Sequence, residues 1–430
     1  MTGIEELIIY RNFENGALLR EMTWIMEHYK QEEYVTEVRS RFFSCMHDLI
    51  DLAGNYGFER NLWQDYLTLL LVNNENVFST ACEIRGITEG SLLDLAKHDF
   101  AIFRELFSYD FAELEKTLHA DFFEEILNYR SGGAAGKVFN RRIRDRICEL
   151  SGQLSGAADL EQFTQYMINF YREFGVGKLG LHKAFRVVHD ENGVQIQPIT
   201  NITHVNLDDL VGYEIPKKKL IDNTEAFVQG RKANNCLLFG DAGTGKSSSV
   251  KAILNRYYDQ GLRIIEIYKH QFKDLNDVIA QIKNRNYRFI IYMDDLSFEE
   301  FEIEYKYLKA VIEGGLEKKP DNILIYATSN RRHLIRESFR DNEERDGDIH
   351  TSDMVQEKLS LVSRVGVSIF FCAPDKKQFQ NIVRTLAARY GVTMPEDELL
   401  LEANKWELSH GGLSGRTAQQ FIDYLLGQMK

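Results

Sequence analysis

The chain has 430 residues and carries 52 Lys and Arg against 65 Asp and Glu, a formal net charge of −13. Apolar residues make up 44% and charged residues 27%, which excludes a disordered chain, and the acidic balance disfavours a protein that coats nucleic acid. The densest apolar run, at 66–72, is far shorter than the ~18 residues of a membrane span, and five Cys without a C-x-x-C pair favour a reducing, cytoplasmic location.

Charge and proline content both divide the chain near residue 200. Residues 1–200 hold 20 Lys and Arg against 31 Asp and Glu, a net charge of −11, whereas the rest is close to neutral at −2. All five Pro stand at position 198 or later, and a segment without proline can be largely helical because proline breaks helix interiors. The length fits two or three domains. We therefore expect a helical N-terminal domain over residues 1–180.

Apolar residues spaced three and four apart predict amphipathic helices in this first part. The predicted stretches are 18–26, 38–52, 62–72, 100–107, 111–127 and 163–174. The period then changes, because residues 184–188 and 194–199 alternate around a turn at 190–193. That alternation predicts a β-hairpin, which we interpret as a connector spanning 181–204.

Short apolar strands alternate with helical stretches from about residue 232, a pattern typical of a parallel sheet with helices on both faces. The expected strands are 236–239, 262–268, 288–293, 322–328 and 367–371. We expect an α/β core of five parallel strands over 205–373. Helical spacing returns at 378–390, 397–406 and 415–426, so a helical segment over 374–430 should follow the core.

Residues 240–247, GDAGTGKS, fit the pattern G-x-x-x-x-G-K-[ST] at every fixed position. Glycines there let backbone N–H groups turn inward and cradle phosphates, and Lys246 adds a charge for the β- and γ-phosphates. The Ser247 hydroxyl can ligate Mg²⁺, and the helix that follows points its positive N-terminus at the same place. The predicted nucleotide-binding residues of this loop are Gly240, Asp241, Ala242, Gly243, Thr244, Gly245, Lys246, Ser247 and Ser248.

Two acidic residues, Asp294 and Asp295, end an apolar strand 48 residues after Lys246. The carboxyl ends of strands in open α/β sheets form the edge where ligands bind. We expect Asp294 to share Mg²⁺ with Ser247, and Asp295 to activate the attacking water. Glu299 and Glu300 follow closely and remain rival candidates for the base.

Further segments, in the same order along the chain, make residues 205–430 resemble the AAA+ ATPases. Residues 323–330 look like the sensor 1 strand of that family, with Asn330 at the polar position that contacts the γ-phosphate or water. Arg364 stands in a segment that looks like the arginine finger, and Arg416 in one that looks like sensor 2. As alternatives, either arginine could serve in a structural salt bridge.

The resemblance also covers the base side of the nucleotide and the overall fold. Residues 210–213 are similar to the adenine-side turn that opens the family's module, which implicates Val211 and Gly212. The resemblance implies a P-loop NTPase module of the AAA+ type with a helical lid at 374–430, which binds ATP and Mg²⁺ and forms ADP and phosphate. A finger at Arg364 would act on a neighbour's ATP, and this implies a homo-oligomer.

The more specific likeness is to a bacterial group of predicted AAA+ ATPases of undefined cellular role, carried by residues 294–298 and 327–334. One departure concerns the base, because many family members have Asp-Glu where this chain has Asp294-Asp295. That departure leaves open whether Asp295 or a nearby glutamate is the base.

Three outputs fit an ATPase of this kind. The first is remodelling of a protein partner recruited by the acidic N-terminal domain. The second is a DNA-associated, loader- or initiator-like ATPase, motivated by the Asp-Asp pair and by basic clusters at 141–146 and 217–219. The third is an ATP-dependent scaffold with little turnover. The charge of the first part favours a protein over nucleic acid, and no membrane partner is expected.

Overall fold

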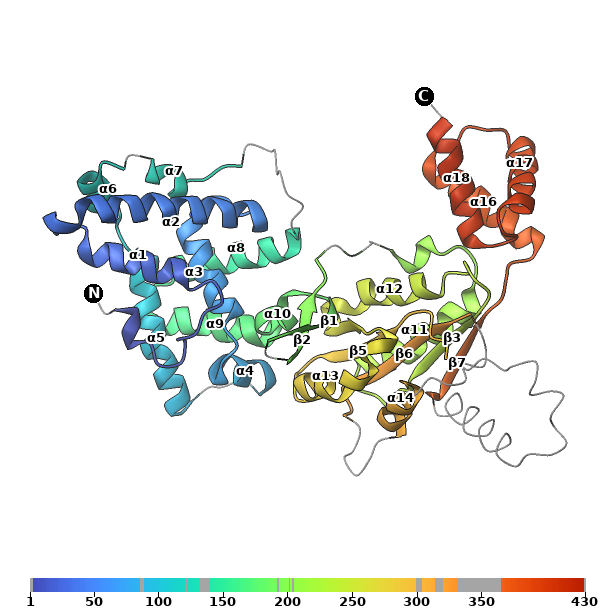
Figure 1. The fold of residues 1–430 in the computed structure, drawn as a ribbon, viewed down its shortest axis with the longest axis horizontal. Helices are drawn as coiled ribbons and strands as arrows, with labels where there is room; N and C mark the ends of the chain where they lie inside the picture. The colour runs from blue at the N-terminus through green and yellow to red at the C-terminus, as the bar shows by residue number, and fades with distance from the viewer. Residues whose placement is uncertain are drawn as a thin grey trace. The chain divides into compact units, whose positions relative to one another are not determined.

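The computed structural model describes residues 3–85, 89–120, 122–131, 140–191, 193–200, 202, 205–298, 304–313, 320–330 and 365–428. The chain divides into two compact units, Met1–His182 and Lys183–Lys430 (Figure 1). None of the helices in the described part of the chain combines the length and the apolar character that crossing a bilayer requires.

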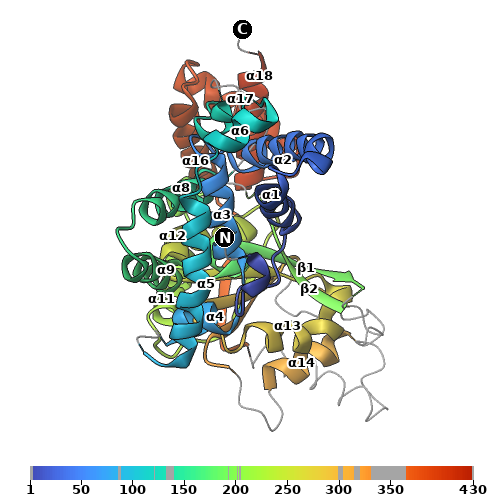
Figure 2. The same cartoon turned by 90° about the vertical axis from the view of Figure 1, so that its left-hand side faces the viewer.

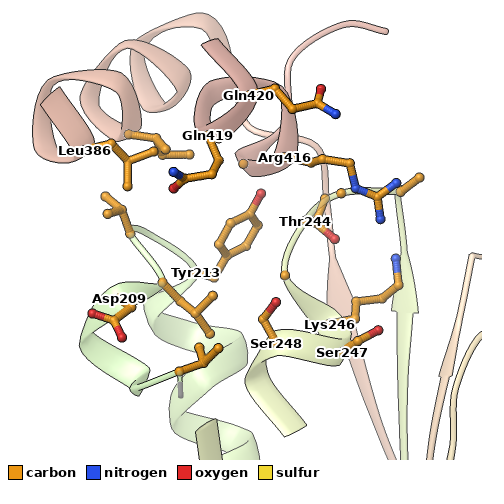
Figure 3. Close-up of a pocket in the computed structure, with 18 of the residues that line it drawn as sticks. Asp209, Tyr213, Thr244, Lys246, Ser247, Ser248, Leu386, Arg416, Gln419 and Gln420 are labelled. Carbon is orange, nitrogen blue, oxygen red and sulfur yellow. The ribbon is translucent and has the colours of Figure 1, made fainter. Parts of the chain in front are cut away.

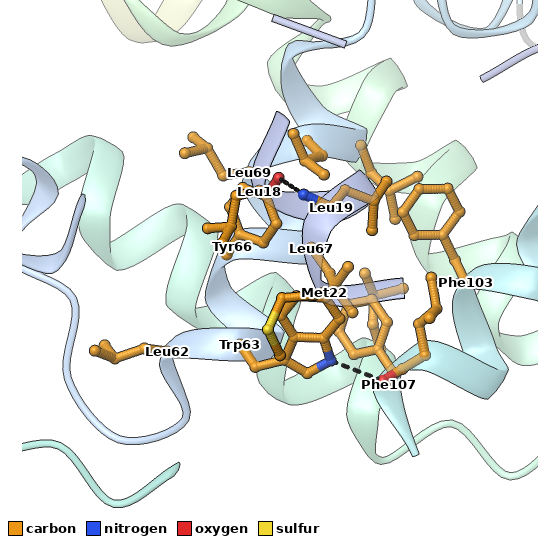
Figure 4. Close-up of a cluster of buried hydrophobic side chains, with 14 of the residues drawn as sticks. Leu18, Leu19, Met22, Leu62, Trp63, Tyr66, Leu67, Leu69, Phe103 and Phe107 are labelled. Carbon is orange, nitrogen blue, oxygen red and sulfur yellow. Dashed lines mark hydrogen bonds between the residues drawn. The ribbon is translucent and has the colours of Figure 1, made fainter. Parts of the chain in front are cut away.

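The first unit is all-helical and packs around α3 (Leu62–Asn73), whose side chains are buried on nearly every side. Apolar residues lie on nearly every side of this helix, as expected of a helix at the centre of a bundle, and Asp65 is buried among them. Its two large aromatic residues also anchor neighbouring segments, because Trp63 donates to the carbonyl of Leu106 and the Tyr66 hydroxyl accepts from the amide of Leu19 (Figure 4). The elements are η1 (Ile4–Glu6), α1 (Ala17–His28), η2 (Glu32–Tyr34), α2 (Val35–Tyr56), α3 (Leu62–Asn73), α4 (Val77–Ile84), α5 (Ser91–Phe107), α6 (Ala112–Leu118), α7 (Phe123–Leu127), α8 (Arg141–Ser155), α9 (Leu160–Phe174) and α10 (Gly177–Leu181).

The helix predicted over 111–127 is in fact two helices, α6 and α7. The chain breaks at His119, which caps α6 with a left-handed backbone (φ +48°). The spacing of apolar residues does not predict helix α4, because this helix has only eight residues. Its start is set instead by a capping box, in which Asn76 accepts from the amide of Ser79 and Ser79 accepts from the amide of Asn76.

The second unit is built on a seven-stranded sheet with the order β2-β1-β4-β5-β6-β3-β7. Its strands are β1 (Ala184–Asp190), β2 (Gly193–Pro198), β3 (Cys236–Gly240), β4 (Leu262–Glu266), β5 (Arg288–Met293), β6 (Ile323–Ser329) and β7 (Val367–Phe371). The five strands expected of the core pair in parallel. The hairpin extends the sheet to seven, because Ala184 of β1 pairs in parallel with Ile264 of β4. The hairpin is therefore part of the sheet rather than a separate connector.

Helices cover both faces of this sheet. Helices α11 (Glu214–Val228) and α12 (Lys246–Tyr257) lie on one face, and α13 (Leu275–Ile282) and α14 (Glu304–Glu313) on the other (Figures 1 and 2). Alternate strand residues such as Cys236, Leu238 and Ile290 pack with α11 and α12 in one apolar cluster. Short 3-10 turns complete the core: η3 (Leu207–Asp209), η4 (Tyr258–Gln260) and η5 (Lys269–Asp274).

Three helices follow the last strand and form the lid: α16 (Lys376–Tyr390), α17 (Glu396–Ser409) and α18 (Gly415–Gln428). They have a core of their own, in which Phe379 and Val383 of α16 pack with Phe421 and Ile422 of α18. The predicted α/β fold class is thus confirmed: a parallel sheet with helices on both faces and a helical segment after the last strand, preceded by an all-α unit. The correction is the strand count, seven in place of five.

Candidate nucleotide-binding site

The predicted site residues lie at the carboxyl ends of three neighbouring strands. In the sheet, β6 stands between β5 and β3, with Met293 opposite Ala327 and Phe239 opposite Ser329. The loop at 240–247 follows β3, Asp294 and Asp295 follow β5, and Asn330 follows β6. Because parallel strands end at the same edge, side chains distant in the sequence meet there.

The loop after β3 needs glycine at two positions where a side chain has no room. Gly240 has φ +132°, and a Cβ atom there would lie 2.0 Å from the carbonyl oxygen of Phe371 in β7. Gly243 has φ +73°, and its Cβ would lie 2.9 Å from Oγ of Ser414, just before α18. The loop is therefore held closely between the sheet and the lid.

Lys246 opens α12 and folds back over the loop that precedes it. Its Nζ donates to the carbonyl oxygens of Gly240 at 2.9 Å and Asp241 at 2.6 Å, and the residue is only 7% exposed. Burial lowers the pKa of the Lys246 ammonium, while Asp241 and Asp295 nearby act in the opposite direction. The cation thus lies along the cradle that phosphates would enter.

Asp294 accepts three hydrogen bonds on one carboxylate oxygen, Oδ1. The donors are Oγ of Ser247 at 2.6 Å, Oγ1 of Thr328 at 2.6 Å and the hydroxyl of Tyr292 at 2.7 Å. Burial acts to raise the pKa of Asp294, but these bonds and the charge of Lys251 outweigh it and hold the pKa below its usual value. Asp294 is therefore kept ionised.

The Ser247–Asp294 pair fits a Mg²⁺ ion that arrives with a polyphosphate. A hydroxyl and a carboxylate oxygen 2.6 Å apart are hard oxygen donors, and Mg²⁺ on nucleotides is usually held by one or two such groups plus phosphate and water. Within the described residues, no cluster of three or more His, Cys, Asp or Glu could hold a metal alone. The donor set therefore suits a metal shared with a ligand.

Asp295, the second acid, is paired with the end of the neighbouring strand. Its Oδ1 accepts from Nδ2 of Asn330 at 2.8 Å, and its backbone N–H donates to Oγ1 of Thr328 at 2.9 Å. Asp295 also has a left-handed backbone, with φ +50°. The carboxylate and the amide are thus held together at the sheet edge.

The lid closes the site from the other side. The backbone N–H of Arg416, in the first turn of α18, donates to the carbonyl of Gly243 at 3.1 Å. The Arg416 side chain points to the same side of the cavity as Lys246, and Gln419 follows one turn later (Figure 3). Arg416 and Lys246 repel one another, which contributes to the lowered pKa of Lys246. An anionic ligand between the two cations would relieve this repulsion.

A second lid contact lies at the opposite end of the cavity. Arg389, in the last turn of α16, donates to the carbonyls of Asp208 at 3.0 Å and Asp209 at 3.3 Å, and its guanidinium lies 3.4 Å from the Asp209 carboxylate. Tyr213 lies between the two lid contacts, with its ring against Phe371 (Figure 3). Burial raises the pKa of Tyr213 to about 12.

Many of these groups line one cavity of about 900 Å³. The predicted residues that line it are Val211, Ala242, Gly243, Thr244, Gly245, Lys246, Ser247, Ser248, Asp294, Asp295, Asn330 and Arg416. Gly212, Gly240 and Asp241 are not among the lining residues. Arg364, Glu299 and Glu300 lie outside the described residues.

Several residues of the site are not predicted by the motifs in the sequence. Thr328 and Tyr292 were overlooked although each stands two residues before a predicted site residue, so each side chain leaves its strand on the same side as Asn330 or Asp294. Gln419 and Gln420 could have been found from helical spacing, because they lie three and four residues after Arg416. The apolar lining from α16, Ile382 and Leu386, has no motif that marks it.

Comparison with known proteins gives a family and a set of fold neighbours. The family described as "Protein of unknown function (DUF815)" matches residues 180–429. A search of curated proteins found no match to the chain. Among solved structures, the P216G mutant of RuvB from Thermotoga maritima is 17% identical over 52% of this chain and 65% of its own, with a TM-score of 0.37.

Two further solved structures are similar over the same extent of this chain. The FIGL-1 AAA domain in complex with ADP is 17% identical over 53% of this chain and 75% of its own, with a TM-score of 0.36. The RuvB Holliday junction branch migration motor of Thermotoga maritima is 14% identical over 51% and 72%, with a TM-score of 0.33. The chain spans just under two thirds of the first RuvB structure, at 65%.

Proposed function

The chain belongs to the family described as "Protein of unknown function (DUF815)", and we propose that it is a P-loop ATPase that hydrolyses MgATP to ADP and phosphate. One observation carries the proposal: three chemically distinct groups converge on one cavity. They are the loop lysine Lys246, the Ser247–Asp294 pair and the Asp295–Asn330 pair. Together they supply what phosphoryl transfer to water requires, namely phosphate binding, a metal site and a base.

Binding of the polyphosphate is assigned to the loop amides, Lys246 and Arg416. Lys246 would exchange the carbonyls of Gly240 and Asp241 for phosphate oxygens, which are stronger acceptors because they are charged. Val211 and the lid side chains Ile382 and Leu386 offer an apolar surface for the adenine ring of ATP at the other end of the cavity.

Hydrolysis is assigned to Asp295 and Asn330. Asn330 orients a water toward the γ-phosphorus, and Asp295 accepts the proton as the new P–O bond forms and the bond to the β-phosphate oxygen breaks. ADP leaves with the bridging oxygen, and inorganic phosphate carries the oxygen of the water. When bound through Ser247 and Asp294, Mg²⁺ neutralises charge on the phosphate oxygens.

The experiment that tests this proposal is the variant Lys246→Ala. Removal of the ammonium should weaken nucleotide binding by about 100-fold or more, because its charge-assisted hydrogen bonds to phosphate are lost. Lys218→Ala, at an exposed position of α11, is the matched control and should bind as the wild type does. The measurement is fluorescence titration with an N-methylanthraniloyl derivative of ADP, beside phosphate release from ATP. Equal binding by both variants would contradict the assignment.

We further propose that hydrolysis drives remodelling of a protein that binds the acidic first unit. Some residues of the basic clusters that motivated a DNA-associated role already contact other residues of the chain. Arg144 pairs with Asp145 at 2.6 Å, and the Arg146 guanidinium lies 4.2 Å from the ring centre of Phe174. Lys217 is buried and donates to the carbonyl of Leu210. Stimulation of ATP turnover by DNA would favour the loader-like alternative. Binding of ATP without turnover would favour the scaffold.

A homo-oligomer and the finger role of Arg364 remain proposals from the sequence. Arg364 lies outside the described residues, so its assignment is supported only by the motif around it.

A further inference from the structure

A buried tyrosine, Tyr292, reaches the metal-facing carboxylate from inside the sheet. It stands on β5 two residues before Asp294 and is only 4% exposed. Its ring belongs to the apolar cluster formed with α11 and α12, and its hydroxyl donates to Oδ1 of Asp294 at 2.7 Å. A phenylalanine would fill the same apolar space, so packing alone does not explain the hydroxyl.

The neighbouring strand provides a direct comparison. Tyr326 of β6 pairs in register with Tyr292 and is fully buried in the same cluster. Its hydroxyl bonds to Nδ2 of Asn223 and to Oγ1 of Thr224, each at 2.9 Å, and both partners lie on α11. Two adjacent tyrosines on one face of the sheet thus direct their hydroxyls to different places, one to the scaffold and one to the site.

The bonds on Asp294 differ in what their donors can do when a cation arrives. Oδ1 receives three donors, although a carboxylate oxygen offers two lone pairs, so it is already fully used. Ser247 donates from the side of the phosphate-binding loop. Its hydroxyl can rotate so that its oxygen faces a metal. Tyr292 and Thr328 donate instead from two neighbouring strands of the sheet, β5 and β6.

Thr328 carries a second bond, because its Oγ1 also accepts the backbone N–H of Asp295 at 2.9 Å. Removing its hydroxyl would therefore disturb both acids. The bond from Tyr292 goes to Asp294. A substitution of Tyr292 is therefore a better test than one of Thr328 for how holding the Asp294 carboxylate affects metal binding.

We propose that Tyr292 is a positioning residue for Mg²⁺: by holding Oδ1 of Asp294, it fixes the carboxylate beside the Ser247 hydroxyl, where the two groups would hold a metal–nucleotide complex. This inference rests on the proposed hydrolysis of MgATP. Groups that hydrogen-bond to a metal ligand, without contacting the metal themselves, typically change metal affinity on the order of 10- to 100-fold. The hydroxyl of Tyr292 has that position relative to Asp294.

The test compares Tyr292→Phe with the matched control Tyr326→Phe in the full chain. The probe is N-methylanthraniloyl ADP, titrated with Mg²⁺ at fixed nucleotide and followed by fluorescence. Tyr292→Phe should raise the Mg²⁺ concentration at half-saturation on the order of tenfold, whereas Tyr326→Phe should leave it unchanged. Nucleotide affinity in EDTA should be the same for wild type and Tyr292→Phe. Binding of Mn²⁺ in the presence of ADP, measured by electron paramagnetic resonance, should weaken in parallel.

Two results would overturn the inference. One is an equal Mg²⁺ dependence in Tyr292→Phe and Tyr326→Phe. The other is a loss of affinity in EDTA as large as that in Mg²⁺, which would mean a general structural defect. If Tyr292→Phe does not fold, Tyr292→Met with Tyr326→Met as its control replaces it: only the first should raise the Mg²⁺ requirement, and equal requirements would overturn the inference.

The proposed function fails in a different way. A wild-type chain that binds no nucleotide in Mg²⁺ or in EDTA would remove the ATPase itself. A wild-type chain that binds nucleotide with the help of Mg²⁺, with no effect of either tyrosine variant, would remove only the role of Tyr292.

Discussion

Asp295 combines a strained backbone with a fixed side chain. A left-handed φ of +50° costs of order 1 kcal/mol or more in a residue other than glycine, and such strain is often found at functional sites. The cost is offset by the bond from its N–H to Thr328 and the bond from Asn330 to its carboxylate. The side chain of Asp295 is shorter than that of a glutamate. Its position is thus set by its neighbours Thr328 and Asn330 rather than by its own length.

We expect Asp295→Asn to separate binding from chemistry. An asparagine tolerates the left-handed backbone and keeps an oxygen for Asn330, but it cannot accept a proton. Nucleotide affinity should stay within about threefold of wild type, while phosphate release falls ~10²- to 10⁴-fold. Release at the wild-type rate would transfer the base to Glu299 or Glu300.

Asp65, in the core of the first unit, makes stability depend on pH. Burial raises the pKa of Asp65 to about 6, although Ser151 and Cys148 bond to its carboxylate and act to lower it. Since the folded pKa lies above the unfolded value near 4, ionising this group destabilises the fold, and the penalty is complete above about pH 6.

Asp65→Asn should therefore stabilise the protein at pH 8, by on the order of 2 kcal/mol. The gain should shrink as the pH falls from 6 and vanish near pH 4, where the wild-type carboxyl is protonated in both states. Urea unfolding followed by circular dichroism at several pH values measures it. Asp48→Asn, at an exposed position of α2, should show no comparable gain. A gain that grows on acidification would refute the sign.

At the scale of elements, local pattern predicted most of the second unit. Each strand of the parallel core follows from a short apolar run, and the loop at 240–247 follows from its own residues. What escaped prediction depends on pairing between distant segments. Nothing in residues 184–198 tells that β1 will pair with β4, nor that Thr328 will bond to Asp294, because both contacts are set by strand order.

Helix α16 carries a matched pair of arginines that can separate the role of the lid. Arg389 binds the carbonyls of η3 at the end of the cavity, whereas Arg384 pairs with Glu396 at 2.6 Å within the lid. Arg389→Ala should speed release of N-methylanthraniloyl ADP roughly three- to tenfold, because the bonds that join lid and core are lost. Arg384→Ala should release it at the wild-type rate. Stopped-flow fluorescence measures both, and equal rates in the two variants would exclude Arg389 as a latch.

At the scale of the whole molecule, the two units have separate apolar cores. The first is formed by side chains of residues 7–181, and the second unit has its own clusters in the sheet and in the lid. A unit with its own core can fold alone. The residues that line the cavity of the candidate site all lie in the second unit.

A fragment of residues 183–430 should therefore fold and bind N-methylanthraniloyl ADP within about threefold of the full chain. Residues 1–182 should fold as a helical unit and serve as bait for the proposed protein partner. Circular dichroism and fluorescence titration test the first expectation. Loss of binding in a folded 183–430 fragment would mean that the helical unit takes part in the site.

The place where the helical unit joins the sheet has a mechanical consequence. A single residue, Lys183, separates the end of the first unit from β1. Tension transmitted along the chain would enter the sheet through β1, with no slack linker to absorb it. There β1 is clamped on both sides, by six residue pairs with β2 and three with β4. Any force that passes between the two units along the chain would therefore act first on this hairpin.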